Sequence, residues 1–120
     1  RISSDFGARV DPLAGGHRHH DGLDLAAPEG TPVLAVKAGV VRRAGDAGGY
    51  GNLVEVDHGG GVVSRYAHQA ELKVAPGDRV EAGDVLGTVG STGRSTGPHL
   101  HLEVLVDGEA VDPDRFLRAR

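Results

Sequence analysis

The 120-residue chain contains no cysteine, methionine or tryptophan, and only two tyrosines and two phenylalanines. Without cysteine, the protein has neither disulfides nor thiolate metal ligands, and the sequence is compatible with either an oxidising or a reducing compartment. With so few aromatic side chains, the core has to be built mainly from valine, leucine and alanine. Valine packs well on a pleated surface, so this composition favours strands. The length allows one domain, which can bury roughly 65% of its unfolded surface.

Two further features are missing. No apolar run approaches the ~20 residues that a transmembrane helix needs, and no basic stripe accompanies the net charge of -4. We therefore expect no membrane span in this segment and no nucleic-acid partner. Because the sequence begins at Arg1 rather than at methionine, we expect a fragment or a processed chain, with any export signal upstream.

Glycine is abundant, with 20 residues. It recurs every few positions, which excludes a bundle of long helices, since each glycine costs a helix interior roughly 1 kcal/mol. From Gly30 onward, short apolar runs alternate with turn sequences, as in all-β sandwiches and barrels. The predicted strands are residues 33–36, 39–41, 53–56, 62–67, 85–89 and 100–106.

The remaining segments are predicted from their turn residues. Asp107-Gly108 indicates a hairpin, and residues 113–117 a short helical turn. The first thirty residues have little apolar periodicity and are predicted to form a loop. Residues 28–33 and 76–80 echo each other, since each places a proline-glycine turn before a valine. This echo indicates an internal structural duplication.

Seven histidines are an excess for this length, and two of them fall in one predicted strand. Because residues two apart share a face, His99, His101 and Glu103 project together. The intervening apolar residues face the core: Leu100, Leu102, Val104 and Val106. One imidazole can bind a metal while the other reaches its bound water or the substrate, although both could also bind one ion.

His20 and Asp24 are four residues apart and share a face in either a helix or a strand; Gly22 and Pro28 favour the extended form. Together with one imidazole from the predicted strand they provide three protein ligands, the number found in catalytic zinc sites. His68 ends another predicted strand and could act as a general base or hold an oxyanion. Taken singly, each of these histidines could equally be structural.

The sequence around His17, His19 and His58 indicates no functional role for these three histidines.

Four ordered segments together resemble the LytM/lysostaphin-type zinc endopeptidases of peptidoglycan, peptidase family M23. The resemblance runs nearly end to end and is carried by residues 2–12, 20–33, 50–68 and 87–103, which include the H-x-x-x-D and H-x-H motifs. The one departure is Gln69-Ala70, where the family often has Leu-Ser, and we expect this pair to touch a groove edge.

The resemblance implies that residues 1–120 form one catalytic domain. Its fold would be an antiparallel β-sandwich or barrel-sandwich hybrid, the duplicated hybrid motif, with loops bordering a substrate groove. By the same resemblance, His20, Asp24 and His101 would bind Zn²⁺, while His68 and His99 would be the catalytic histidines. Which of the two is the general base stays open.

The implied function is zinc-dependent hydrolysis of peptide bonds in peptidoglycan, in the periplasm, the cell envelope or outside the cell. Cleavage of D-Ala–meso-diaminopimelate cross-links is favoured over glycyl-glycine bridges, since the central block lacks long insertions. We expect a monomeric catalytic domain, and this is compatible with a regulatory domain upstream of it.

The sequence also bears on alternative functions outside hydrolysis. An inactive relative that activates cell-wall amidases would characteristically have lost ligand residues, and none is missing here. A lipoyl or biotinyl carrier would need a lysine at a hairpin tip, and neither Lys37 nor Lys73 has that context. A phosphocarrier using a histidine pair would not need Asp24.

Overall fold

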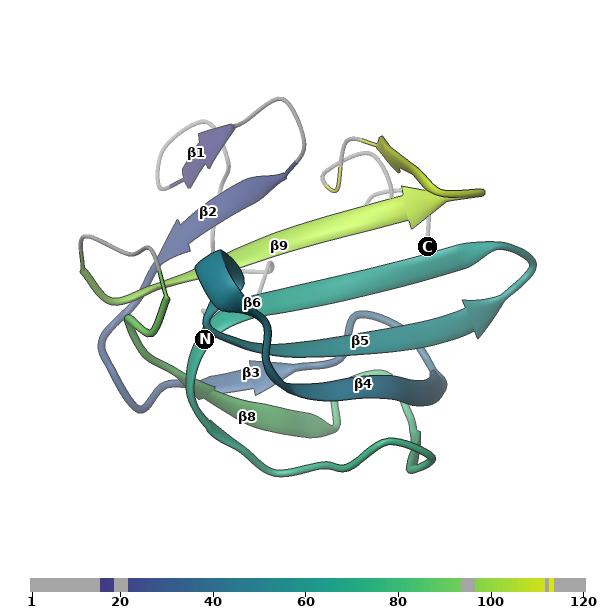
Figure 1. Ribbon diagram of the computed structural model, residues 1–120, viewed down its shortest axis with the longest axis horizontal. Helices are drawn as coiled ribbons and strands as arrows, with labels where there is room; N and C mark the ends of the chain where they lie inside the picture. The colour runs from purple at the N-terminus through teal and green to yellow at the C-terminus, as the bar shows by residue number, and fades with distance from the viewer. Residues whose placement is uncertain (1–15, 19–21, 94–96, 112, 114–120) are drawn as a thin grey trace.

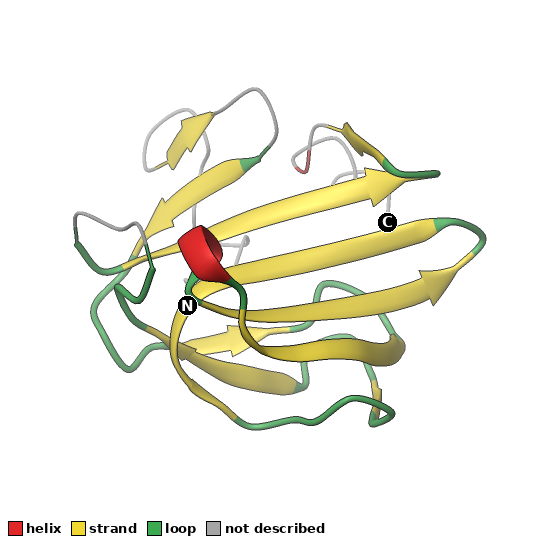
Figure 2. Ribbon diagram, in the orientation of Figure 1, coloured by secondary structure: helices red, strands yellow, loops and turns green. Residues whose placement is uncertain are grey.

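The computed structural model describes residues 16–18, 22–93, 97–111 and 113, and their regular secondary structure is almost entirely β-strand (Figures 1 and 2). The elements are β1 (Gly16–Arg18), β2 (Leu23–Ala26), β3 (Pro32–Leu34), β4 (Gly39–Asp46), the 3-10 helix η1 (Gly48–Tyr50), β5 (Asn52–Gly59), β6 (Val62–Leu72), β7 (Arg79–Val80), β8 (Val85–Val89), β9 (His99–Val106) and β10 (Glu109–Val111). None of the described helical residues forms a segment long and apolar enough to cross a membrane.

Each of the six predicted strand ranges overlaps an observed strand, and β4, β5 and β6 extend further than predicted. The predicted hairpin is also confirmed, because Asp107 and Gly108 join β9 to β10 with φ of 53° and 86°, the two positive angles that a type I′ turn requires. Of the predicted helical turn, only Pro113 belongs to the described residues, and it is helical.

The prediction of a loop over the first thirty residues is wrong, because β1 and β2 lie within it. Strand β2 offers only Leu23 and Leu25 as an apolar alternation, which is too short to stand out in a sequence. Its extended form is fixed by its neighbour, since β2 pairs antiparallel with β9. One residue that was predicted to face the core does not: Val106 lies at the end of β9 and is 36% exposed.

All ten strands of the described part of the chain belong to one hydrogen-bonded sheet that folds over itself. The longer path runs β1-β2-β9-β6-β5-β4-β7, and β9, β6, β5 and β4 lie side by side in Figure 1. Strand β6 also joins a second layer: Val62 to Ala67 pair with β9, whereas Gln69 to Leu72 pair with β8, which pairs with β3. His68 lies at the transition with φ of 62°, a left-handed conformation.

The predicted duplication has a counterpart in the pairing of the short strands. The segment 28–33 leads into β3 and then β4, while 76–80 leads into β7 and then β8. Strand β3 pairs with β8, and β4 pairs with β7. Each strand of the first unit, β3 and β4, thus pairs with a strand of the second unit, β7 and β8. Matching backbone bonds join the connecting residues, with Gly83 N–H donating to Ala35 O and Gly77 N–H to Val41 O. This reciprocal pairing supports the duplicated hybrid motif.

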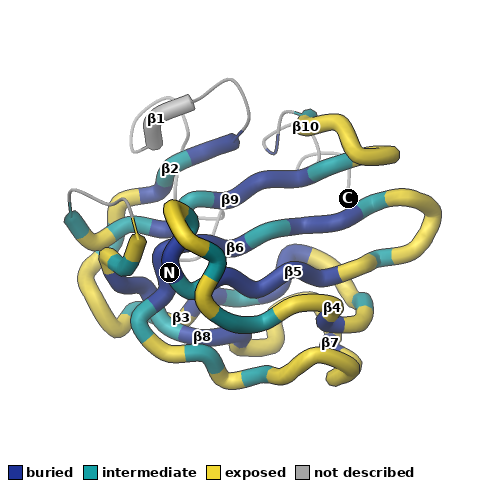
Figure 3. The backbone as a smooth tube through the Cα atoms, viewed as in Figure 1, coloured by how far each residue is buried: buried dark blue, intermediate teal, exposed yellow. Residues whose placement is uncertain are grey.

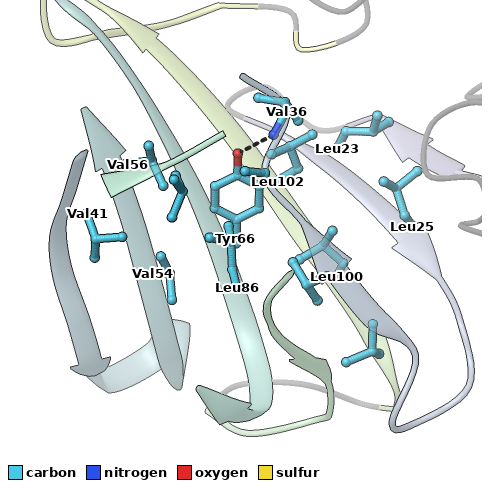
Figure 4. Close-up of a cluster of buried hydrophobic side chains, with 14 residues drawn as sticks. Leu23, Leu25, Val36, Val41, Val54, Val56, Tyr66, Leu86, Leu100 and Leu102 are labelled. Atoms are coloured by element: carbon cyan, nitrogen blue, oxygen red, sulfur yellow. Dashed lines mark hydrogen bonds between the residues drawn. The ribbon is translucent and has the colours of Figure 1, made fainter. Parts of the chain in front are cut away.

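The hydrophobic core lies between the layers, and Figure 4 shows its side chains converging from several strands. Figure 3 shows buried stretches of chain along β5, β6 and β9, with exposed turns around them. Tyr66 is the largest fully buried side chain, and its hydroxyl accepts a 3.0 Å hydrogen bond from the backbone N–H of Val36. This hydrogen bond offsets the cost of burying the phenol hydroxyl.

A short chain of polar groups continues from the Tyr66 hydroxyl to the surface. Ser64 Oγ lies 2.7 Å from the Tyr66 hydroxyl and 2.8 Å from Nε2 of His58, whose Nδ1 lies 2.8 Å from the carbonyl oxygen of Ala38. The carbonyl only accepts, so His58 donates from Nδ1 and can accept from Ser64 at Nε2 when neutral. His58 therefore has a structural role that its sequence surroundings did not indicate.

The pKa of His58 makes this role testable. Burial lowers that pKa below its ordinary 6.5, and Lys37 acts in the same direction, against the opposing effects of the Ala38 carbonyl and Asp57. The folded chain therefore takes up this proton less readily than the unfolded chain. Stability should fall as pH falls through about 6.5, whereas above that pH the histidine contributes no pH dependence.

We expect the urea midpoint of the wild type to drop more between pH 8 and pH 5 than that of His58→Gln, which cannot titrate. The difference between the two curves isolates His58 from the other ionisable groups. Parallel curves would show that His58 does not set this pH dependence.

Candidate metal and catalytic site

The antiparallel pairing of β2 with β9 brings together residues that are far apart in the sequence. Asp24 lies directly opposite His101, and Ala26 opposite His99. Strand β6 lies on the other side of β9, where Ala67 is opposite His101 and His68 follows. The sheet thus gathers the H-x-H motif, Asp24 and His68 at one place. The prediction that His99 and His101 share a face with Glu103 agrees with the alternating burial of the leucines between them.

His101 is held between two carboxylates. Its Nδ1 atom lies 2.6 Å from Oδ1 of Asp24, and its Nε2 atom lies 2.9 Å from Oε2 of Glu103. Burial opposes a charge on this ring, but the two carboxylates outweigh burial and raise the pKa of His101 to about 9. The ring also fills the space beside Gly22, where an added Cβ would lie 2.7 Å from Cε1 of His101. Gly22 is therefore required for this close approach.

His68 and His99 are each oriented by a backbone carbonyl. Nδ1 of His68 donates to the carbonyl oxygen of Thr92 at 2.7 Å, and Nδ1 of His99 donates to that of Gly97 at 2.9 Å. Because a carbonyl only accepts, the proton of each ring is placed on Nδ1. The ring centroids of His68 and His99 lie 4.9 Å apart, and Nε2 of His99 lies 3.5 Å from Oδ1 of Asp24.

The proton state of His68 differs from that of His101. Burial lowers the pKa of His68, and the neighbouring His99 and His101 lower it further, while the Thr92 carbonyl and Asp24 act in the opposite direction. His68 is thus neutral near pH 7. With its proton on Nδ1, the Nε2 atom carries a lone pair, as a general base needs.

The expected position of His68 at a strand end is wrong in detail. Strand β6 continues to Leu72, and His68 lies within it as a buried residue, 7% exposed. Its left-handed φ interrupts the strand alternation, so four consecutive residues from Tyr66 to Gln69 are buried. Gln69 is 0% exposed and donates from Nε2 to the carbonyl of Tyr66. The expected contact of Gln69 with a groove edge is therefore not found.

The donors that converge here suit a zinc ion only in part. Asp24 supplies a carboxylate oxygen and His101 an imidazole nitrogen that face each other, and both are ordinary zinc ligands. The third predicted ligand, His20, lies outside the described residues. Within those residues, no group of three or more His, Asp or Glu side chains is arranged to hold a metal ion by itself. The donor chemistry fits zinc if His20 completes the set.

Sequence reasoning missed a group of polar residues beside His101. Glu103 is 2% exposed, and it accepts hydrogen bonds from the Tyr50 hydroxyl at 3.2 Å and from Nη1 of Arg65 at 3.2 Å. Arg65 in turn donates to Glu55. The H-x-H-x-E alternation already placed Glu103 on the face of the histidines. Its partners Arg65 on β6 and Tyr50 on η1, and Glu55 beyond Arg65 on β5, could not be found without the strand register.

The fold and the residues gathered at the site can be compared with known proteins. Residues 18–113 match peptidase family M23, and the chain belongs to this family, as the sequence resemblance predicted. A curated relative, the DD-carboxypeptidase/endopeptidase Mpg of Neisseria meningitidis serogroup B, is 51% identical over 113 residues, which cover 94% of this chain and 26% of the relative. The chain thus spans about a quarter of the length of the curated relatives that it resembles.

Solved structures confirm the predicted fold class. The catalytic domain of the antimicrobial peptidase lysostaphin from Staphylococcus simulans matches with a TM-score of 0.83 at 32% identity, over 96% of this chain and 97% of that one. A zinc-containing peptidase from Vibrio cholerae matches with a TM-score of 0.77 at 37% identity, over 88% of this chain and 33% of that one.

The carbonyl that orients His68 depends on a glycine. Gly51 has φ of 67°, and a Cβ there would lie 2.4 Å from the carbonyl carbon of Thr92. Gly51→Ala should therefore displace Thr92 and weaken its bond to Nδ1 of His68. Gly48→Ala is a matched control, because Gly48 has φ of 65° but no atom within 4 Å of the added Cβ.

Both variants should lose about 1–2 kcal/mol of stability from the left-handed backbone, and Gly51→Ala should lose more because of the clash. Urea unfolding measures the two losses, and the NMR signal of the His68 Nδ1 proton should change only in Gly51→Ala. Equal losses with an unchanged His68 signal would contradict the assigned role of Gly51.

Proposed function

We propose that this domain is a zinc-dependent endopeptidase that hydrolyses peptide bonds in peptidoglycan. The observation that carries the proposal is the convergence of Asp24, His68, His99 and His101 from three strands of one sheet. Membership of peptidase family M23 and the name of the Neisseria relative support the reaction class. The zinc-containing peptidase of similar fold supports the metal.

The proposed ligands are His20, Asp24 and His101. Zinc in a site of this kind polarises a peptide carbonyl and acidifies water. The chain itself supplies the proton transfers, and the Nε2 lone pair of neutral His68 suits it to accept a proton from the attacking water. His99, fixed through Nδ1 to the Gly97 carbonyl, can share the role of base at Nε2, or, once Nε2 also carries a proton, donate it to the developing oxyanion.

The proposed substrate is the peptide cross-link of peptidoglycan, with the D-Ala–meso-diaminopimelate bond favoured. The name DD-carboxypeptidase/endopeptidase of the relative with 51% identity supports this choice over the glycyl-glycine bond. Residues 1–120 would be one catalytic domain, monomeric and acting in the periplasm, the cell envelope or outside the cell. Regulatory segments in the rest of a longer chain are compatible with this proposal.

Single substitutions should separate the two kinds of site residue. Asp24→Ala removes a metal ligand, so zinc content measured by elemental analysis should fall together with hydrolysis of purified sacculi. His68→Ala and His99→Ala should retain zinc but lose about 100-fold or more in rate, because only proton transfer and charge stabilisation are removed. Unchanged zinc content in Asp24→Ala would contradict the ligand assignment.

The bond that is cut can be identified by mass spectrometry of muropeptides released from sacculi with defined cross-links. We expect products of D-Ala–meso-diaminopimelate cleavage, lost on chelation and restored by zinc. Release from pentaglycine-bridged peptidoglycan instead would assign the glycyl-glycine specificity. Sacculi that stay intact with the zinc-loaded protein would support the inactive amidase activator.

A further inference from the structure

We propose that Glu103, held in place by Arg65 and Tyr50, is a positioning residue that fixes the ring of His101 with its Nδ1 atom toward Asp24. Through this orientation, Glu103 would set the affinity of the site for zinc. The inference rests on the proposed function, because it assumes that His101 is a metal ligand. It concerns a residue that touches neither the substrate nor the proposed metal.

The first step is the contact between Glu103 and His101. Oε2 of Glu103 lies 2.9 Å from Nε2 of His101. A carboxylate only accepts, so Glu103 holds the proton on Nε2 of His101, and a bound metal would have to take the place of the proton on Nδ1 instead. Nδ1 is also the atom that faces Oδ1 of Asp24, at 2.6 Å. The side chain of Glu103 therefore selects the nitrogen that meets the carboxylate ligand.

The second step is the fixation of Glu103 itself. Its side chain is 3% exposed, and Oε1 accepts from Nη1 of Arg65 at 3.2 Å, while Oε2 accepts from the Tyr50 hydroxyl at 3.2 Å. The guanidinium of Arg65 also supplies an opposite charge beside the buried carboxylate. A buried charged carboxylate with three donors has little freedom to rotate away from the imidazole.

The third step is the row of charges that holds Arg65. Strand pairing places Glu103 on β9 opposite Arg65 on β6, and Arg65 opposite Glu55 on β5. Arg65 Nε donates to Glu55 at 2.8 Å, and Arg42 of β4 donates to the other oxygen of Glu55 at 2.8 Å. Opposite charges thus alternate across four strands and end at His101. Such partners of a metal-binding histidine typically change metal affinity 10–100-fold when removed.

The test compares zinc affinities by competition with a coloured chelator. Glu103→Gln keeps the shape but loses the charge, and zinc should bind about 10–100-fold more weakly. Arg65→Met should weaken zinc binding by a smaller factor. If Arg65 acts through Glu103, the double variant should bind no more weakly than Glu103→Gln alone. Arg42→Met is the matched control, because Arg42 contacts Glu55 but not Glu103, and its zinc affinity should stay within about twofold of the wild type.

A spectroscopic measurement on the zinc-loaded protein distinguishes positioning from general stability. The Nε2 proton of His101 should give a protected NMR signal in the wild type and in Arg42→Met, and this signal should be lost in Glu103→Gln. If Glu103→Gln does not fold, Tyr50→Phe removes one donor from a partly exposed position and should shift the same signal.

Unchanged zinc affinity in Glu103→Gln, or an unchanged His101 signal in Tyr50→Phe, would overturn the inference. Additive losses in the double variant would also overturn it, because Arg65 would then act independently of Glu103. Failure of the wild type itself to bind zinc is a separate result, which would overturn the proposed metal site and the inference together.

Discussion

The structure depends on one strand that belongs to two layers. Up to Ala67, β6 is bonded to β9 and faces the candidate site, and from Gln69 it is bonded to β8 in the second layer. The transition falls on a single residue, His68, in a left-handed conformation that costs a non-glycine residue about 1–2 kcal/mol. Pairing on both sides holds the residue there. The residue at which β6 passes from one layer to the other is therefore also the residue whose imidazole lies in the candidate site.

The surroundings of His101 and of His68 give these two imidazoles different proton states, although their ring centroids lie only 6.1 Å apart. His101 lies between carboxylates and holds a proton, whereas His68 has a carbonyl at one nitrogen and imidazoles as neighbours, and is neutral. The acceptors differ in origin: the two carboxylates lie on β2 and β9, whereas the Thr92 carbonyl lies in the connection between β8 and β9. Strand register and this connection together give the two imidazoles different surroundings.

Much of the fold could be predicted from alternation and turn residues: the strand cores, the Asp107-Gly108 hairpin and the face shared by His99 and His101. Strand β2 could not be predicted, because two alternating leucines are too few to indicate a strand, and its extended form depends on pairing with β9. The left-handed residue within β6 was equally hidden, since histidine carries no conformational signature of the kind that glycine does, and so the burial of Gln69 was missed. Register across three strands brings Arg65 to Glu103 and Glu55 to Arg65, and no local pattern specifies it.

The exchange of partners between β3, β4 and β7, β8 has a consequence for how the chain folds. No unit of the duplication is complete by itself, since each short strand finds its neighbour in the other half. A chain emerging from a ribosome would expose unpaired edges of β3 and β4 until β7 and β8 had been synthesised, and Asp24 would have no neighbouring strand until β9 followed. Closing such distant contacts makes folding slow and cooperative. The candidate site is therefore among the last parts of the molecule to form, and a nascent or truncated chain would lack it.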